Sequence, residues 1–243
     1  MCRAILFYIG LSCALLAAAA DKPIWARKAV PIGECHGSLQ GRGIPAPDSN
    51  IAIEVGCHPS QKDVDPIPYL HVRTASGNWH DVEVDEGAHE VLWSPDSKAF
   101  LVNGGTSAYA GFFTTVYVLS SDAVQKLRVT EAVQTDMVMT FPPCKALDRN
   151  ESTCAATARD PEFNISGVAW VRGSSGIVVM AEVPCSSSYG GIMCQVQGYE
   201  LNVPEGGIAM RMTARQLKAR WQQRMAWHMW IPDPPEYGPA QFK

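Results

Sequence analysis

One short phrase occurs more than once in this chain, and its spacing constrains the fold more than any other feature. Residues 46–53 (APDSNIAI) return as residues 94–101 (SPDSKAFL), and a looser copy follows at Trp170. Repetition at this spacing is typical of folds built from copies of one supersecondary unit. Scaffold repeats do not identify a ligand, and we find no catalytic signature. The pattern therefore predicts how the chain is built rather than what it does.

The repeated unit is predicted to be a four-stranded antiparallel meander. Residues 50–213 consist of short runs rich in Val, Ile, Phe and Tyr, broken by Gly, Pro, Ser and Asp, which predicts an all-β class with almost no helix. Trp93 precedes Phe100 by seven residues, and Trp170 precedes Ile177 by the same distance. Each pair is expected to bracket a strand–turn–strand hairpin, and a second hairpin follows each one. The expected units cover residues 40–87, 88–130 and 165–213.

Residues 93–98 (WSPDSK) carry a resemblance to a known family. They resemble the Trp-Ser-Pro-Asp-Gly-Lys turn of TolB-type β-propeller blades, which are relatives of the WD-repeat propellers, and depart from it only at Ser97. The first copy keeps Pro47-Asp48 without the Trp, and the third keeps Trp170 without Pro-Asp. The resemblance implies a propeller-like array of blades. Propellers close with four to eight blades and only three are recognisable here, so an open stack or a β-sandwich of the same meanders remains an alternative. Because propellers include enzymes, receptors and scaffolds, the resemblance implies no particular activity.

Two segments depart from the strand pattern. Residues 131–164 contain Pro142-Pro143 and two cysteines, and are expected to be a disulfide-stapled insertion.

One C-terminal α-helix is expected over about 214–229, because Thr213 and Gln216 have capping-box spacing. An apolar stripe recurs every four residues along it: Leu217, Trp221, Met225 and Met229. Its basic residues have no acid among them, which favours either an anionic membrane surface, an acidic partner or a solvated outer face: Arg215, Lys218, Arg220 and Arg224.

The first twenty residues have the order of a secretory signal peptide. Arg3 precedes an apolar run that ends in four alanines before Asp21. We expect cleavage after Ala20, which leaves residues 21–243 as a single domain in the periplasm or secreted. Lipid attachment at Cys13 is an alternative, although the usual Leu three places before that Cys is missing. No later segment is long and apolar enough to predict a membrane span.

Six cysteines remain after the signal peptide, and an even number in an exported chain predicts a disulfide framework. Short loops close at the lowest entropic cost. The expected pairs are therefore Cys35 with Cys57, Cys144 with Cys154, and Cys185 with Cys194. A zinc site at Cys35-His36 and Cys57-His58 is the alternative that a reducing compartment would favour.

Two Gly-rich loops are the predicted binding positions. They hold Gly104, Gly105 and Tyr109 in the second unit, and Tyr189, Gly190 and Gly191 in the third. Equivalent loops emerge at the same end of a blade array, where Tyr offers apolar area and a hydrogen-bonding hydroxyl. The alternative is that the glycines serve turn geometry and each Tyr packs on its own unit.

Histidines recur every nine residues at His71, His80 and His89, with Asp81 and Asp85 nearby. No compact ligand motif links them, so they are expected to be structural or surface residues. The sequence assigns no catalytic residue, no metal site and no cofactor.

The sequence thus predicts an exported, non-catalytic binding or protein-interaction module. Its expected partner is another envelope protein or a small ligand, and the net charge of −4 argues against nucleic acid. The alternative is a secreted hydrolase or metal-dependent enzyme on the same scaffold, and a third possibility is a structural envelope protein.

Overall fold

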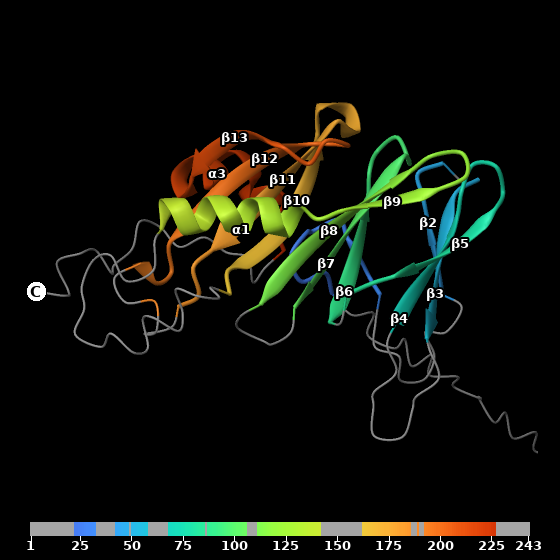
Figure 1. Cartoon of the computed structure of the whole chain (residues 1–243), viewed down its shortest axis with the longest axis horizontal. Helices are drawn as coiled ribbons and strands as arrows, with labels where there is room; N and C mark the ends of the chain where they lie inside the picture. The colour runs from blue at the N-terminus through green and yellow to red at the C-terminus, as the bar shows by residue number, and fades with distance from the viewer. Residues whose placement is uncertain are drawn as a thin grey trace, which may run out of the picture.

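The structure, a computed structural model, describes residues 22–32, 42–48, 50–57, 68–85, 87–105, 111–141, 162–185, 189 and 192–226. The described residues are mostly β, with three antiparallel sheets and two short α-helices (Figure 1). This confirms the predicted class of antiparallel meanders.

Each sheet contains four consecutive strands in meander order. The first sheet holds β2 (Arg42–Pro45), β3 (Ala52–Cys57), β4 (Pro68–Arg73) and β5 (Trp79–Glu83). The second holds β6 (Ala88–Trp93), β7 (Ala99–Gly105), β8 (Phe112–Leu119) and β9 (Val124–Leu127), with β1 (Val30–Pro31) added beside β6. The third holds β10 (Asn164–Val171), β11 (Gly176–Glu182), β12 (Val196–Asn202) and β13 (Ile208–Thr213). A 3₁₀ turn, Arg172–Ser174, joins β10 to β11. Trp93 pairs with Phe100 and Trp170 with Ile177, as the hairpin prediction required.

The three sheets pack face to face in chain order. One hydrophobic cluster joins the first and second sheets, through residues such as Val72 and Phe100. Another joins the second and third sheets, where Leu101 and Ile177 take part. No hydrophobic cluster of the described residues joins the first sheet to the third. Over the described ranges the sheets therefore form an open stack, and a closed ring is not seen.

The repeated phrase forms turns that contact one another from sheet to sheet. The backbone N–H of Asp48 donates to Ser97 Oγ at 2.7 Å, and the backbone N–H of Asp96 donates to Ser174 Oγ at 3.3 Å. Both serines adopt left-handed backbone conformations, with φ of 61° at Ser97 and 83° at Ser174. The same serine position of each later turn therefore receives a hydrogen bond from the turn of the preceding sheet.

The tryptophans of the repeated unit make a second recurring contact. Trp93 Nε1 donates to the carbonyl oxygen of Ile44 at 3.3 Å, and Trp170 Nε1 donates to that of Leu92 at 3.1 Å. Ile44 and Leu92 occupy corresponding positions in the first strands of their meanders. Each indole thus connects its own sheet to the preceding one.

A helix lies in a region where the sequence predicted almost no helix and an insertion over residues 131–164. The helix α1 (Val129–Thr140) buries Val129, Val133 and Met137, which recur every four residues, against the second and third sheets. Its buried Asp136 accepts hydrogen bonds from Tyr199 and Arg211 of the third sheet. The prediction of almost no helix is wrong here. Burial of Val129, Val133 and Met137 outweighs the low helix propensity of the Val and Thr residues in this segment. Residues 142–161, including Cys144 and Cys154, lie outside the described ranges.

The C-terminal helix α3 (Ala214–Trp221) covers the far face of the third sheet, where Leu217 is fully buried. Its predicted capping box is confirmed, since Thr213 and Gln216 bond each other's backbone N–H groups. The helix is shorter than the predicted 214–229. A 3₁₀ turn (Gln222–Arg224) follows, and Met225 is extended because it forms a β-bridge with Ala26.

A buried carboxylate holds the N-terminal segment 22–32 against the second sheet. Glu90 on β6 is 1 % exposed and accepts the backbone N–H groups of Ile24, Trp25 and Ala26, at 2.6, 3.2 and 2.8 Å. Asn103 Nδ2 donates to the same carboxylate at 2.8 Å and also to the carbonyl oxygen of Gly167 in the third sheet. Burial raises the pKa of Glu90, and these hydrogen bonds act in the opposite direction. The network connects the N-terminal segment to both sheets.

The disulfide predictions are tested in part. Cys185 and Cys194 form a disulfide with their Cα atoms 4.5 Å apart, as predicted. Cys57 is also disulfide-bonded, while its predicted partner Cys35 lies outside the described residues.

Candidate functional site

The first sheet carries an exposed group of aromatic and charged side chains on the face that points away from the second sheet. Alternation along each strand creates this face. On β4, Leu70 and Val72 are buried against the second sheet, so the intervening His71 and Arg73 point outward. We call Glu54, His71, Arg73, Trp79 and Asp81 the end-face patch.

The corresponding face in the other two sheets is mostly apolar and covered by the preceding sheet, although Thr115 and Lys126 stand where the first sheet has His71 and Trp79. Strand pairing from the Trp93 and Trp170 hairpins gives the correspondence. Val102 and Val179 stand where the first sheet has Glu54, and Tyr117 and Leu201 stand where it has Arg73. Pro45 replaces the tryptophan that would donate to a preceding sheet. A polar outer face is what the terminal unit of a stacked array requires for contact with water.

His71 and Asp81 lie opposite each other on β4 and β5 and are bonded directly. His71 Nδ1 is 2.5 Å from Asp81 Oδ1. Because a carboxylate only accepts hydrogen bonds, the imidazole proton lies on Nδ1, and Nε2 remains for a second partner. The side chain of Asp81 is 71 % exposed and that of His71 is 36 % exposed, so a ligand in solution can reach both.

Trp79 connects this pair to Arg73. Its ring stacks on His71 at 4.5 Å between centroids with the planes only 2° apart, and the Arg73 guanidinium carbon lies 5.9 Å from the indole centroid. Arg73 Nε also donates to the carbonyl oxygen of Asn50 at 3.0 Å, which fixes the position of the guanidinium group. These contacts hold the side chains in one arrangement, so the surface is pre-organised.

The His71–Asp81 pair has one of the features that general-base catalysis requires. A His–Asp pair orients an imidazole as a general base, but catalysis also requires a nucleophile or a bound water in reach of Nε2. Within the described ranges no Ser, Thr or Cys hydroxyl or thiol is hydrogen-bonded to His71. The same ranges hold no cluster of three or more His, Cys, Asp or Glu side chains suited to a metal ion.

The structure separates the other residues of the histidine group. His80 points from β5 to the opposite face, toward the second sheet, where its Nε2 is buried with no hydrogen-bond partner among the described residues. His89 on β6 lies beside Trp25, with 5.7 Å between ring centroids. The three histidines that recur in the sequence therefore do not meet.

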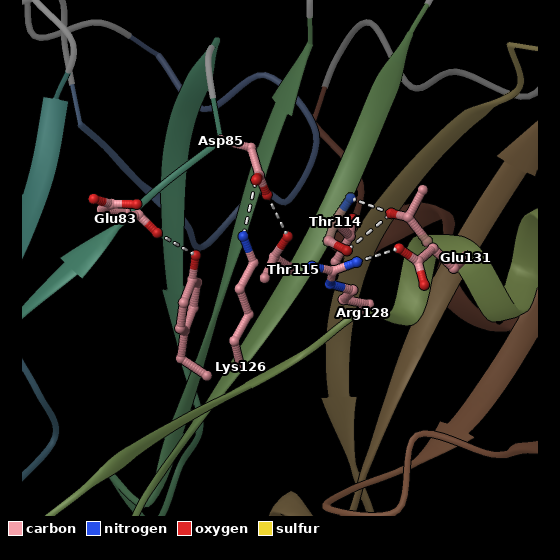
Figure 2. Close-up of polar contacts among 9 residues, drawn as sticks. Glu83, Asp85, Thr114, Thr115, Lys126, Arg128 and Glu131 are labelled. Carbon is pink, nitrogen blue, oxygen red and sulfur yellow. Dashed lines mark hydrogen bonds and ion pairs between the residues drawn. The ribbon is translucent and has the colours of Figure 1, made fainter.

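Asp85 belongs to the junction between the first two sheets. It forms an ion pair with Lys126 Nζ at 2.8 Å and accepts a hydrogen bond from Thr115 at 3.0 Å (Figure 2). Tyr117 donates to the carbonyl oxygen of Glu83 at 3.2 Å in the same region. Thr114, which precedes Thr115 on β8, attaches the start of α1 (Figure 2). Its backbone N–H donates to Thr130 Oγ1, and the Thr130 hydroxyl donates to the Thr114 carbonyl oxygen, both at 2.9 Å. These contacts join elements of the scaffold.

The described residues of the two predicted binding loops are engaged in packing. Tyr189 is 8 % exposed, and its hydroxyl donates to the carbonyl oxygen of Glu162 at 2.8 Å. Gly104 and Gly105 are buried within β7, and the N–H of Gly105 donates to the carbonyl oxygen of Gly87. A Cβ at position 104 would lie 2.5 Å from that same oxygen. Tyr109, Gly190 and Gly191 lie outside the described residues, so a binding role for these loops stays a prediction.

Glu182, at the end of β11, is a titratable group near these loops that the sequence did not single out. It accepts a hydrogen bond from Asn164 at 3.2 Å, and burial raises its pKa while this bond lowers it. Cys185 Sγ of the disulfide lies 3.8 Å from its carboxylate.

No helix of the described ranges is both long and apolar enough to cross a bilayer. No protein-family model matches this sequence, and no curated protein or solved structure matches it either, so these comparisons identify neither a TolB-type nor a WD-repeat propeller.

Proposed function

We propose that this protein is an exported binding module that recognises another exported protein through the end-face patch. One observation carries the proposal: this face is mostly apolar and packed against the preceding sheet in the second and third sheets, whereas in the first sheet it presents a fixed group of rings and charges. A terminal unit needs only polarity to remain in water, and scattered Lys or Glu side chains provide that. A stacked Trp–His pair with an adjacent Arg goes beyond this need.

The composition of the patch favours a protein partner. Trp, Tyr and Arg are the residues most enriched at energetic centres of protein interfaces. Trp79 is 38 % exposed, Arg73 lies beside it, and both stand on a regular sheet face rather than on a loop. A rigid base of this kind lowers the entropic cost of association.

The charges of the patch indicate what the partner offers. Glu54 and Asp81 flank His71 on neighbouring strands, so two carboxylates lie in one cross-strand row. A complementary surface carries a cation opposite this row and an apolar group against Trp79.

Export is supported by the order of residues 1–20 and by the disulfide between Cys185 and Cys194, because disulfides persist in oxidising compartments. A non-catalytic role is supported by the surroundings of the His71–Asp81 pair, because no Ser, Thr or Cys side chain of the described residues is hydrogen-bonded to His71.

The test is photo-crosslinking in the native host. A photoreactive amino acid replaces Glu54 in the patch or, as a matched control, the exposed Gln125 on β9. We expect one discrete adduct from position 54 and none from position 125. Adding Trp79→Ala should reduce the position-54 adduct by about tenfold or more, since an exposed aromatic anchor is lost.

The Trp79→Ala chain must keep its cooperative thermal transition, because the cross-strand contacts it loses are worth only about 1 kcal/mol. An adduct that forms equally at both positions, or that ignores Trp79→Ala in the folded chain, overturns the proposal.

A further inference from the structure

The structure brings together two segments that are far apart in the sequence and are both exclusively basic. Residues 22–32 and 214–226 contain seven of the twenty Lys and Arg residues of the chain and none of its twenty-four Asp and Glu residues. The seven are Lys22, Arg27, Lys28, Arg215, Lys218, Arg220 and Arg224. Since the whole chain has a net charge of −4, the remainder is strongly acidic.

The two segments are in direct contact. Ala26 and Met225 form a β-bridge, and the N–H of Arg27 donates to the carbonyl oxygen of Arg224 at 2.8 Å. The N–H of Ala226 donates to the carbonyl oxygen of Trp25 at 2.8 Å, and Arg27 Nε reaches the carbonyl oxygen of Met225. We call the seven residues on these joined segments the basic pole.

Six of the seven cations of the pole remain available to a ligand. Lys22, Arg27, Lys28, Arg215, Arg220 and Arg224 are exposed, and within the described ranges none of them forms an ion pair with a carboxylate. Glu90 contacts this region, but it is buried and its carboxylate accepts backbone N–H groups. An uncompensated cluster of this size creates a strong local positive potential.

We propose that the basic pole binds the anionic surface of a phospholipid membrane. Clustered Lys and Arg on a surface helix are typical of proteins that bind acidic headgroups, and each cation near such a surface contributes about fivefold in affinity. The chain continues from Ala226 into Trp227-His228-Met229-Trp230-Ile231. Trp is enriched at membrane–water interfaces, so the neighbouring sequence favours a membrane over an acidic protein.

This inference is independent of the end-face patch. The pole involves α3 and the far side of the third sheet, whereas the patch lies on the first sheet at the other end of the stack (Figure 1). A protein that binds a membrane at one end presents its other end to a partner.

The experiment is co-sedimentation of the folded chain 21–243 with vesicles of phosphatidylcholine, with and without phosphatidylglycerol. We expect binding only to the vesicles that contain phosphatidylglycerol, and release when NaCl is raised from about 0.1 M to about 1 M. The double variant Lys28→Gln/Arg220→Gln should weaken binding on the order of 20-fold.

The matched control is Lys98→Gln/Arg128→Gln, which removes the same charge from exposed positions outside the pole. It should bind as the parent chain does, and both variants should keep the parent far-UV spectrum and thermal midpoint. Equal loss in the two variants, or no binding to phosphatidylglycerol, overturns the proposal. Capture of a poly-glutamate peptide without vesicle binding also overturns it and indicates an acidic protein partner instead.

Discussion

The indole nitrogen of Trp170 donates a hydrogen bond to the carbonyl oxygen of Leu92, across the interface between the third and second sheets. Trp93 makes the corresponding contact to Ile44 one sheet earlier. The recurrence shows that the two interfaces share one geometry.

Replacing the donor tests the value of this contact. Trp170→Phe keeps an aromatic ring and removes the N–H, so it should lower the free energy of unfolding by about 1 to 2 kcal/mol. The control is Trp79→Phe, which makes the same change at a ring that forms no hydrogen bond with the described residues, and it should cost less than about 0.5 kcal/mol. Urea denaturation measures both, and equal losses in the two variants would show that ring size rather than the hydrogen bond matters.

The buried carboxylate of Glu90 should be hard to replace. Four donors surround it, so Glu90→Gln turns its amide N–H group toward a donor and should destabilise the chain by about 2 to 4 kcal/mol. Glu182→Gln is the control, because among the described residues that carboxylate accepts one hydrogen bond, from Asn164, which an amide oxygen can also accept; about 1 kcal/mol or less is expected.

The stability of the parent chain relative to Glu90→Gln should depend on pH with a definite sign. Burial raises the pKa of Glu90 above its ordinary 4.5. The contribution of Glu90 to the free energy of unfolding is therefore complete below pH 4.5 and is lost as the pH rises through the folded-state pKa. The stability gap between the parent chain and Glu90→Gln should therefore narrow as the pH increases from about 4 to about 8. A gap that widens over this range would contradict the assignment.

Asp136 should show the opposite slope. Hydrogen bonds from Arg211 hold the pKa of Asp136 below its ordinary 3.8, although burial acts against them. The contribution is therefore present above that pH and is lost as the pH falls through the folded-state pKa. Asp136→Asn should lower the thermal midpoint by about 3 to 6 °C near neutral pH, with a difference that shrinks in acid.

A second carboxylate on the same helix provides the control. Glu131 and Arg128 form an exposed ion pair, so Glu131→Gln should leave the midpoint within about 1 °C of the parent value. Scanning calorimetry at neutral and acid pH measures both variants, and a loss at Asp136 that does not depend on pH would rule out its charge as the cause.

The role of Gly104 can be separated from ligand binding. A Cβ at this position would lie 2.3 Å from the ring of Phe113 as well as 2.5 Å from the carbonyl oxygen of Gly87. Gly104→Ala should cost about 1 to 3 kcal/mol, whereas Gly43→Ala, with no atom within 4 Å of the added carbon, should change stability by less than about 0.5 kcal/mol. Guanidinium denaturation measures the free energy of unfolding of both variants. An unchanged value for Gly104→Ala would contradict the packing role and favour a role in binding.

The parts of the fold that the sequence predicted depend on short-range signals. The Trp93–Phe100 and Trp170–Ile177 hairpins, the Thr213 capping box and the Cys185–Cys194 disulfide each need only residues within about ten positions of one another. The helix α1 was missed although Val129, Val133 and Met137 recur every four residues, because Val and Thr dominate its composition.

The end-face patch was only partly visible in the sequence. His71 and Asp81 were noted as neighbours, but their bond depends on the register of β4 and β5. Trp79 and Arg73 could not be recognised, because their exposure follows from the position of the first sheet at the end of the stack, which is a long-range property. The missing tryptophan at Pro45 was the available signal that the first sheet lacks the indole contact to a preceding sheet.

The attachment of residues 24–26 to Glu90 also determines when the molecule can be completed. Synthesis delivers these residues early, yet their partners at Glu90 and at Met225 and Ala226 emerge about 60 and 200 residues later. The N-terminal segment can therefore pair with β6 early, but its contacts with Met225 and Ala226 must wait until almost the whole chain has been made. A chain stopped before Met225 lacks the β-bridge to Ala26, so the contact between the beginning and the end of the fold forms last.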